Sequence, residues 1–294
     1  MKFKKKMIAA AVLSLGMILT ACGGNSNDGE GTIGDAVDYT IIGIEPGAGV
    51  MQATEQALQE YKNLEKWDLQ ESSSTAMATE LQKAYEKEEP IVVTGWTPHW
   101  KFAKFDLKFL EDPKGIYGEA ETIETYTRKG FKDDQPNAYK VLDQFYWEPE
   151  DMEAVMVKIN DGTDPKMAAR QWVDENSDKV AEWIKGAEKV HGDPISLAYV
   201  AWDSEIASSN VVAAVLEDLG YQVELVQLEA GPMYAALAQG EVDATVSVWS
   251  PLTHKDYLEQ YGDQMEGLGP NLEGAKTGLV VPSYMDVESI EDLE

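Results

Sequence analysis

The amino-acid sequence predicts an α/β protein of two lobes, each built on a mostly parallel sheet. One order of elements, strand, helix, strand, helix, strand, occurs twice, in residues 39–100 and in residues 195–254. Both blocks also end in the same short pattern, "GWTP" in the first and "VWSP" in the second. Each block therefore has the content of a βαβαβ unit, and ligands of such parallel sheets bind beyond the carboxyl ends of the strands.

Short apolar runs mark the strands of both blocks. In the second block, the apolar residues between Val212 and Leu219 recur at helical spacing, and Gly220 is the expected C-cap. "SSSTAMATELQKAY" and "GPMYAALAQG" occupy matching places as the second helices. The expected strands are Thr40–Ile44, Trp67–Gln70 and Ile91–Thr94 in the first block, and Ile195–Ala201, Gln222–Leu228 and Ala244–Val248 in the second.

The first residues of the chain predict a lipoprotein signal peptide, which is set apart from the fold. A start with four lysines precedes an apolar run, Met7–Ala21, that is too short for a comfortable membrane span. The run leads into "LTAC", which looks like a bacterial lipobox, and Cys22 is the single cysteine of the chain. We therefore expect residues 1–21 to be removed, Cys22 to carry a lipid, and residues 22–38 to form a flexible tether. The alternative is an ordinary signal peptide with a chance cysteine.

The composition excludes several classes of protein. The formal net charge is −29, and loss of the four signal-peptide lysines changes it to −33. Such a chain is not expected to bind nucleic acid or to use a polybasic membrane surface. One cysteine allows no disulfide framework and no thiolate metal cluster, and the three histidines, His99, His191 and His254, show no metal-ligand spacing. We expect neither a metal nor a cofactor.

Three tryptophans lie at the carboxyl ends of predicted strands, where a ligand would bind. Trp96 and Trp249 occupy matching places in the two closing patterns, and Trp202 follows the first strand of the second block. A single tryptophan at a strand end is more often a packing residue, but three at equivalent strand ends favour ligand contact. Trp100 is left undecided between these roles. The remaining tryptophans, Trp67, Trp147, Trp172 and Trp183, are interpreted as packing residues.

The residues around these indoles indicate a ligand with two opposite charges. Indole faces attract a cation that cannot donate hydrogen bonds, such as a quaternary ammonium group. The glycine-rich loop Gly43–Met51 leads into a helix N-terminus, which favours a carboxylate or phosphate, although a tight turn is the simpler interpretation. His254 adds a donor or is a lone surface histidine. Asp203 and Glu205 cap the helix after Trp202, or else neutralise a cation such as choline. Glycine betaine is the smallest molecule that carries both poles.

Several segments together resemble a known family. "TGWTPHW", "LAYVAWDSEIAS", "LEDLGY", "EAGPMY" and "GLVVPSYM" are similar to the glycine betaine-binding lipoproteins of Gram-positive osmoprotectant ABC transporters. The resemblance runs from about Tyr39 to the end of the chain. It implies a type II periplasmic-binding-protein-like fold whose two lobes close on the ligand and present it to a permease driven by a separate cytoplasmic ATPase.

The resemblance also implies roles for individual residues. The aromatic cage of the family falls on Trp96, Trp202 and Trp249. Its carboxylate contacts fall on the backbone amides of Gly49 and Val50 and on the side chain of His254. The loop here reads "EPGAGV" and ends in valine, a change that matters little for a contact made by a backbone amide.

The order of the two lobes looks circularly permuted relative to many members of the family. The unit that begins "ISLAYVAWDSE" comes second here, and "GLVVPSYMDVESIEDLE" ends the chain. The strand "TGLVVP" is therefore expected to return to the first lobe, and the helices around residues 150–187 to pack on the second. The expected boundaries are residues 39–110 with about 268–294 for the first lobe, 111–150 for an interlobe crossover, and 151–267 for the second lobe.

These observations predict a monomeric, lipid-anchored binding protein on the outer face of the cell membrane, with no catalytic activity. Its expected ligand is glycine betaine or a similar compact betaine such as proline betaine. A choline or carnitine receptor of the same transporter class is the first alternative. A secreted hydrolase is the second, although the chain contains neither a G-x-S-x-G elbow nor an H-E-x-x-H zinc site.

Overall fold

The structure, a computed structural model, describes residues 32–294. The predicted signal peptide 1–21, Cys22 and most of the predicted tether therefore lie outside the described residues. The strands are β1 (Thr40–Ile42), β2 (Asp68–Gln70), β3 (Val92–Thr97), β4 (Leu107–Phe109), β5 (Glu121–Arg128), β6 (Pro194–Tyr199), β7 (Gln222–Gln227), β8 (Ala244–Ser250) and β9 (Met265–Pro282).

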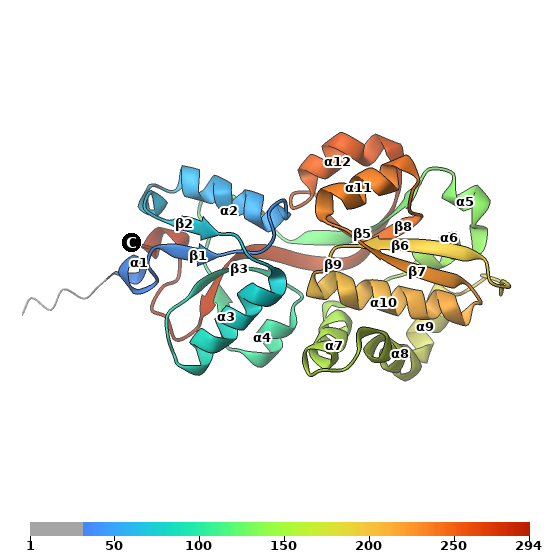
Figure 1. Ribbon diagram of the computed structural model, residues 1–294, viewed down its shortest axis with the longest axis horizontal. Helices are drawn as coiled ribbons and strands as arrows, with labels where there is room; N and C mark the ends of the chain where they lie inside the picture. Colours follow the sequence, from blue (N-terminus) through green and yellow to red (C-terminus); the bar gives the residue numbers. More distant parts are fainter. Residues whose placement is uncertain (1–31) are drawn as a thin grey trace, which may run out of the picture. The chain divides into compact units, whose positions relative to one another are not determined.

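These strands form one connected series that is shared by two lobes (Figure 1). Its order is β2-β1-β3-β9-β5-β8-β6-β7, and β4 pairs with β9 beside this path. In the first lobe β1 is parallel to β2 and β3, and in the second lobe β6 is parallel to β7 and β8. The predicted fold class, two α/β lobes with mostly parallel βαβαβ units, is confirmed.

The long strand β9 belongs to both lobes. Its first part, Met265–Ala275, pairs with β5 of the second lobe, and its last part, Lys276–Pro282, pairs with β3 and β4 of the first. All of these pairings are antiparallel. The prediction that the C-terminal strand returns to the sheet of the first lobe is confirmed.

Helices cover both faces of each sheet (Figure 1). In the first lobe α2 lies on one face, and α3 and α4 lie on the other. In the second lobe α11 and α12 lie on one face, and α10 lies on the other with α7 and α8 outside it. The helices are α1 (Ile33–Ala36), α2 (Gly49–Glu60), α3 (Ser74–Glu86), α4 (Trp100–Lys104), α5 (Phe131–Asp134), α6 (Pro136–Gln144), α7 (Pro149–Asn160), α8 (Pro165–Glu175), α9 (Ser177–Trp183), α10 (Asp203–Asp218), α11 (Ala230–Gln239) and α12 (Lys255–Tyr261), with short 3₁₀ helices at Lys62–Leu64, Gly262–Gln264 and Ile290–Asp292.

The helix α10 explains why the helices between residues 150 and 187 pack on the second lobe. Twelve of its sixteen residues are buried, because the sheet covers one side and α7 and α8 cover the other. The second lobe therefore has a second layer of helices on this face, which confirms the predicted packing of this helical segment. A cluster of indoles fills that layer. Trp172 lies with its ring centroid 5.6 Å from those of both Trp147 and Trp183, so the interpretation of these three as packing residues is confirmed.

Two segments near the ends of the predicted lobes have more structure than the sequence suggested. Residues 33–36, at the end of the predicted tether, form α1, and the amide of Gly34 donates to the carbonyl of Glu294. Residues 111–150, the predicted crossover, contain β5, which pairs with β8 and β9. The boundaries of the lobes stay a prediction. Among residues 32–294, no helix is long and apolar enough to cross a membrane.

Candidate ligand-binding site

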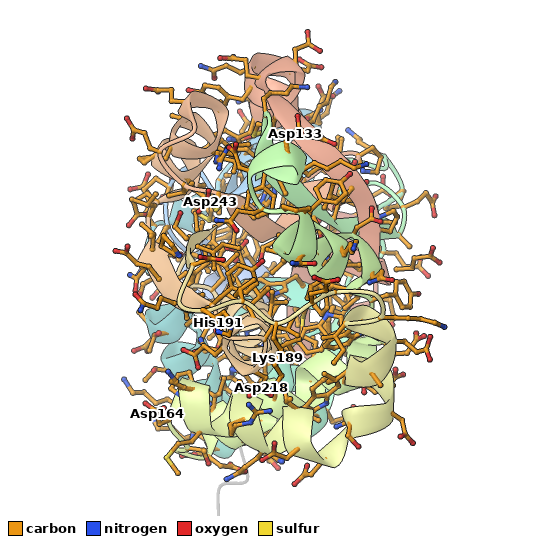
Figure 2. The ribbon with its side chains drawn as sticks, turned by 90° about the vertical axis from the view of Figure 1, so that its right-hand side faces the viewer. Asp133, Asp164, Lys189, His191, Asp218 and Asp243 are labelled. Carbon is orange, nitrogen blue, oxygen red and sulfur yellow. The ribbon has the colours of Figure 1, made fainter. Side chains whose placement is uncertain are left out.

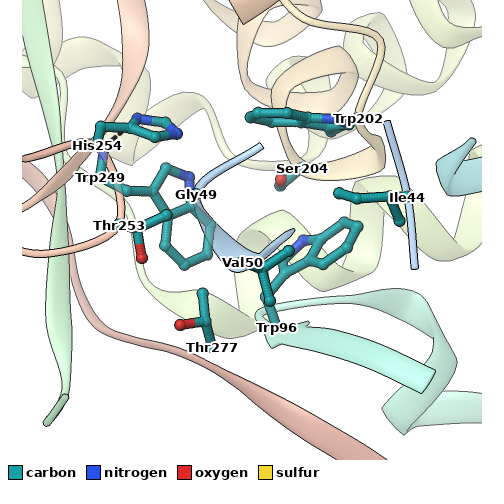
Figure 3. A pocket seen from close by; sticks show the side chains of 10 residues that line it. All are labelled: Ile44, Gly49, Val50, Trp96, Trp202, Ser204, Trp249, Thr253, His254 and Thr277. Atoms are coloured by element: carbon teal, nitrogen blue, oxygen red, sulfur yellow. Dashed lines mark hydrogen bonds between the residues drawn. The ribbon is translucent and has the colours of Figure 1, made fainter. Parts of the chain in front are cut away.

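One pocket lies where the two lobes meet (Figure 3). It contains about 310 Å³ of space, part of it open to solvent. All six residues that the sequence predicts for a ligand site lie on its walls. The lining residues are Ile44, Gly49, Val50, Trp96, Trp202, Ser204, Trp249, Thr253, His254 and Thr277.

The three indoles that line the pocket, called the tryptophan cage here, come from three different elements. Trp96 and Trp249 are the next-to-last residues of β3 and β8, which run further than the predicted strands, and Trp202 is the N-cap of α10. They are only 4%, 4% and 6% exposed, respectively. Their rings stand around one space from different sides (Figure 3). The cage therefore offers several π faces to a cation in a site with little water.

The orientation of one cage indole is fixed by a hydrogen bond between the lobes. The Nε1–H group of Trp202 donates to the carboxylate of Glu45, in the loop before α2, at 3.1 Å. The other oxygen of Glu45 accepts from the amide of Ser74 at the start of α3. Glu45 thus connects the cage to two helices of the first lobe.

The N-terminus of α2 supplies free amide donors at the wall of the pocket. Gly49 and Val50 are the first two residues of the helix, so their N–H groups have no acceptor within it. No other acceptor for them is found among the described residues. The positive end of the helix dipole points the same way, so the wall favours a carboxylate.

His254 adds a side-chain donor whose tautomer is set by its neighbours. Its Nδ1 atom accepts from the amide of Trp249 at 3.0 Å and lies 2.7 Å from the hydroxyl of Tyr234. Burial lowers the pKa of His254 to about 3, so the ring is neutral and the proton lies on Nε2. This Nε2 atom is buried and has no hydrogen-bond partner among residues 32–294. The ring therefore presents an unpaired N–H donor in a pocket that also holds the free amides.

The loop that carries His254 is held by a buried carboxylate. Glu121 of β5 accepts from the amides of Leu252 and Thr253 at 2.6 and 2.8 Å and from the Thr253 hydroxyl. The carbonyl of Thr253 lies close to Gly49, because a Cβ atom added to Gly49 would be 1.9 Å from it. The two lobes therefore touch at this wall of the pocket, and only glycine fits there.

The acidic residues after Trp202 do not act as predicted. Asp203 is the first residue of α10 and its carboxylate does not cap the helix; it accepts from the Ser74 hydroxyl at 2.9 Å and from the Trp100 indole at 2.8 Å. Burial opposes ionisation, but the nearby His99 and these two hydrogen bonds lower the pKa of Asp203. Glu205 is fully buried and accepts from the amide of Val200. Neither carboxylate lines the pocket.

Other residues near the cage have roles that the sequence left open or missed. Trp100 is buried and joins the lobes through Asp203, but it does not line the pocket. Ser204 lines the pocket with a buried hydroxyl that has no hydrogen-bond partner in the described part of the chain. Its position two residues after Trp202 is the one sequence feature that could have indicated a place in the pocket. Thr277 enters from β9, where it lies opposite Trp96, and no local pattern marks it.

The third histidine takes no part in the site. His191 is exposed on the face of the second lobe that is turned away from the first (Figure 2). Within residues 32–294, no group of histidine, cysteine and acidic side chains has the arrangement of a metal site.

Two α/β lobes that enclose a pocket lined by both define a substrate-binding protein of the two-lobed class. The chain belongs to the OpuAC family, the substrate binding domain of ABC-type glycine betaine transport systems, which it matches over residues 24–175 and 193–294. The family resemblance seen in the sequence is confirmed.

Three proteins of known ligand class are similar to this chain. The chain is 52% identical over 295 residues to the glycine betaine/carnitine transport binding protein GbuC of Listeria monocytogenes serotype 1/2a (strain 10403S), covering 99% of this chain and 98% of that protein. Lactococcal OpuAC, in its closed-liganded conformation with glycine betaine, is 49% identical over 52% of this chain and 61% of its own, with a TM-score of 0.49. An ABC-transporter choline binding protein in complex with choline is 26% identical over 64% of this chain and 61% of its own, with a TM-score of 0.46.

Proposed function

We propose that this chain captures glycine betaine, and compact betaines such as proline betaine, outside the cytoplasm and delivers it to an ABC importer for osmoprotection. The observation that carries the proposal is that one buried pocket combines three indoles with unpaired N–H donors. The indoles receive the quaternary ammonium group, and the amides of Gly49 and Val50 with His254 receive the carboxylate. Each cation–π contact contributes about 0.5–2 kcal/mol, and the donors add charge-assisted hydrogen bonds. Together they support micromolar affinity, about −8 kcal/mol.

The pocket favours a zwitterion over choline. Choline has no carboxylate, so it would leave the two amides and the Nε2–H of His254 without an acceptor. It would also need a protein carboxylate to balance its charge, and Asp203 is already bonded to Ser74 and Trp100. No acidic residue is among those that line the pocket.

Carnitine remains the stronger alternative within the same class. The Listeria relative is named for both glycine betaine and carnitine. Carnitine carries both poles on a longer chain, so it satisfies the cage and the donors only if the pocket accepts the greater separation. The affinity for carnitine relative to that for glycine betaine therefore measures how closely the pocket walls fit the shorter ligand.

The proposed mechanism is closure of the two lobes around the ligand. Hydrogen bonds between the lobes surround the pocket: Trp202 with Glu45, Asp203 with Ser74, and the Tyr257 hydroxyl with the Gly47 carbonyl at 2.8 Å. A ligand that touches both lobes stabilises this arrangement by its differential affinity for it. The closed form would then be recognised by the permease, with a separate ATPase driving transport and a lipid on Cys22 holding the protein at the membrane.

The test is a titration of intrinsic tryptophan fluorescence with glycine betaine, carnitine and choline in turn. We expect a saturable change with glycine betaine at micromolar concentrations and little change with choline. Saturation by choline at lower concentrations than glycine betaine would remove the carboxylate part of the proposal. No response to any of the three, together with an unchanged melting temperature, would reject a betaine receptor.

A further inference from the structure

A lysine side chain is buried behind the tryptophan cage. Lys101 of α4 is 0% exposed, and its amine has no hydrogen-bond acceptor among the described residues. The Nζ atom lies 4.5 Å from the centroid of the Trp96 ring and 5.8 Å from that of Phe102. Burial of an unpaired ammonium is among the least favourable arrangements in a protein, so this lysine needs an explanation.

We propose that Lys101 is a positioning residue of the betaine site, whose amine lies against Trp96 and sets how strongly that indole attracts the quaternary ammonium group. This inference rests on the proposed function. A charged amine on the indole competes with the ligand for the negative π surface and repels the ligand's cation. A neutral amine packs against the same ring and leaves the π surface to the ligand.

The packing around Lys101 gives the amine a defined place. Lys101 does not line the pocket, whereas Trp96 does, so the amine contacts the ring from outside the ligand space. The amine also lies close to Gly95, the residue before Trp96: a Cβ atom there would lie 2.4 Å from Cγ2 of Val280 and 3.2 Å from Nζ of Lys101. The amine is thus held between the strand that carries Trp96 and the helix that follows.

The surroundings make the charge of this amine sensitive to pH near neutrality. Burial lowers the pKa of Lys101 to about 7, and the charge of Asp203 opposes that effect. His99, on the same turn, is neutral at this pH, because burial and the charge of Lys101 lower its pKa to about 4. Two further elements pack against this region and carry charges: α7, with Glu153, and β9, with Lys276 opposite Thr97.

The inference predicts a pH-dependent affinity and a proton release. Neither pole of glycine betaine changes charge between about pH 5.5 and pH 9, so a pH profile in this range reports on the protein. We expect the dissociation constant of the wild type to fall about tenfold as pH rises through this range. By linkage, ligand binding near neutral pH should expel a proton from the amine.

The experiment compares the full chain with Lys101→Met and Lys101→Arg by calorimetric titration of glycine betaine between about pH 5.5 and about pH 9. Lys101→Met should hold the high affinity across the range, and Lys101→Arg, which stays charged, should hold the low affinity. Lys66→Met is the matched control, since Lys66 lies 5.4 Å from the Tyr39 ring and is exposed. It should keep the wild-type profile.

A second variant and a measurement of proton release test whether the pH dependence comes from Lys101. Glu205→Gln tests a second buried group of the described residues that titrates in this range, since burial raises the pKa of Glu205 to about 8. This variant should keep the profile. If Lys101→Met does not fold, proton release by the wild type, measured in buffers of different ionisation enthalpy, tests the inference in its place. A wild-type affinity that does not vary with pH, a profile that survives in Lys101→Met, or binding without proton release would overturn the inference. Absence of betaine binding at every pH would instead reject the proposed function.

Discussion

At the scale of single residues, the ring of His254 has two nitrogen atoms with separate tasks. Nδ1 accepts from Trp249 inside the protein, and Nε2 is left as the donor in the pocket. His254→Asn keeps an acceptor at the position of Nδ1 and deletes Nε2. We predict that this variant loses at least about tenfold in glycine betaine affinity, because a charge-assisted hydrogen bond is lost. Calorimetric titration measures the loss.

Choline binding to the same variant is the control for this prediction. Choline has no carboxylate, so its weak binding should not change in His254→Asn. Because burial holds the pKa of His254 at about 3, the ring stays neutral between about pH 5 and pH 8, and its titration should not appear in the affinity. Equal losses for glycine betaine and choline would mean that the substitution had disturbed the cage and had not removed a carboxylate contact.

The cage gives a second prediction at this scale, centred on Trp249. Trp249→Ala removes one π face and opens a cavity beside the ligand, so we expect glycine betaine affinity to fall more than tenfold. Trp249→Phe keeps an aromatic face and should retain part of the affinity. Fluorescence or calorimetric titration of both variants ranks them. Near-wild-type binding by Trp249→Ala would assign this indole to packing.

The sequence predicts the aromatic part of the site better than the rest. Trp96 and Trp249 lie at the ends of apolar strands, and the carboxyl ends of parallel strands meet at one edge. Thr277 could not be found in the same way, because its position depends on the pairing of β9 with a strand about 180 residues earlier in the chain. The burial of Lys101 could not be predicted from the sequence either, because a lysine in a short helix is normally exposed.

At the scale of elements, the first turn of α2 must approach the loop before α12 closely. A Cβ atom on Gly49 would overlap the Thr253 carbonyl at 1.9 Å, and this contact joins the two lobes. We predict that Gly49→Ala lowers glycine betaine affinity more than tenfold, because the lobes cannot close fully. Alanine is the better helix former, so the melting temperature without ligand should change little. Calorimetric titration and thermal unfolding give the two values.

Gly231→Ala is the matched control for this element. Gly231 lies in the first turn of α11, and a Cβ atom there would meet only the Tyr257 ring, at an ordinary 3.8 Å. Its ligand affinity should stay at the wild-type value. If Gly49→Ala binds as tightly as Gly231→Ala, the contact between Gly49 and Thr253 does not limit closure.

The elements also show which parts of a fold an apolar pattern identifies. The strands of the two βαβαβ units were predicted to within a few residues, and β3 and β8 are buried along nearly their whole length, as expected of apolar runs in a parallel sheet. The strand β5 was missed, because "ETIETYTR" has only two apolar side chains, Ile123 and Tyr126, which do not alternate, and carries three charges. Only its neighbours β8 and β9 bury every second side chain and make it a strand.

At the scale of the whole molecule, buried titratable groups make stability depend on pH in opposite directions. His254 and His99 have native pKa values of about 3 and about 4, so between these values and about 6.5 the unfolded chain binds more protons. The free energy of unfolding therefore falls as pH falls through this range. Glu205 acts the other way: the native state holds its proton up to about pH 8, whereas the unfolded state releases it near 4.5. Its contribution to stability is lost as pH rises between these values.

We predict that Glu205→Gln removes this loss at higher pH. Glutamine keeps an oxygen that can accept from the Val200 amide, and it never ionises. The free energy of unfolding of the variant, relative to wild type, should therefore rise between about pH 5 and pH 8 by up to about 1.4 kcal/mol per pH unit. Urea unfolding without ligand at several pH values measures this difference, and Glu188→Gln, at an exposed glutamate, should follow the wild type. A difference that stays constant with pH would mean that Glu205 is ionised in the native protein and that its buried charge is balanced by its surroundings.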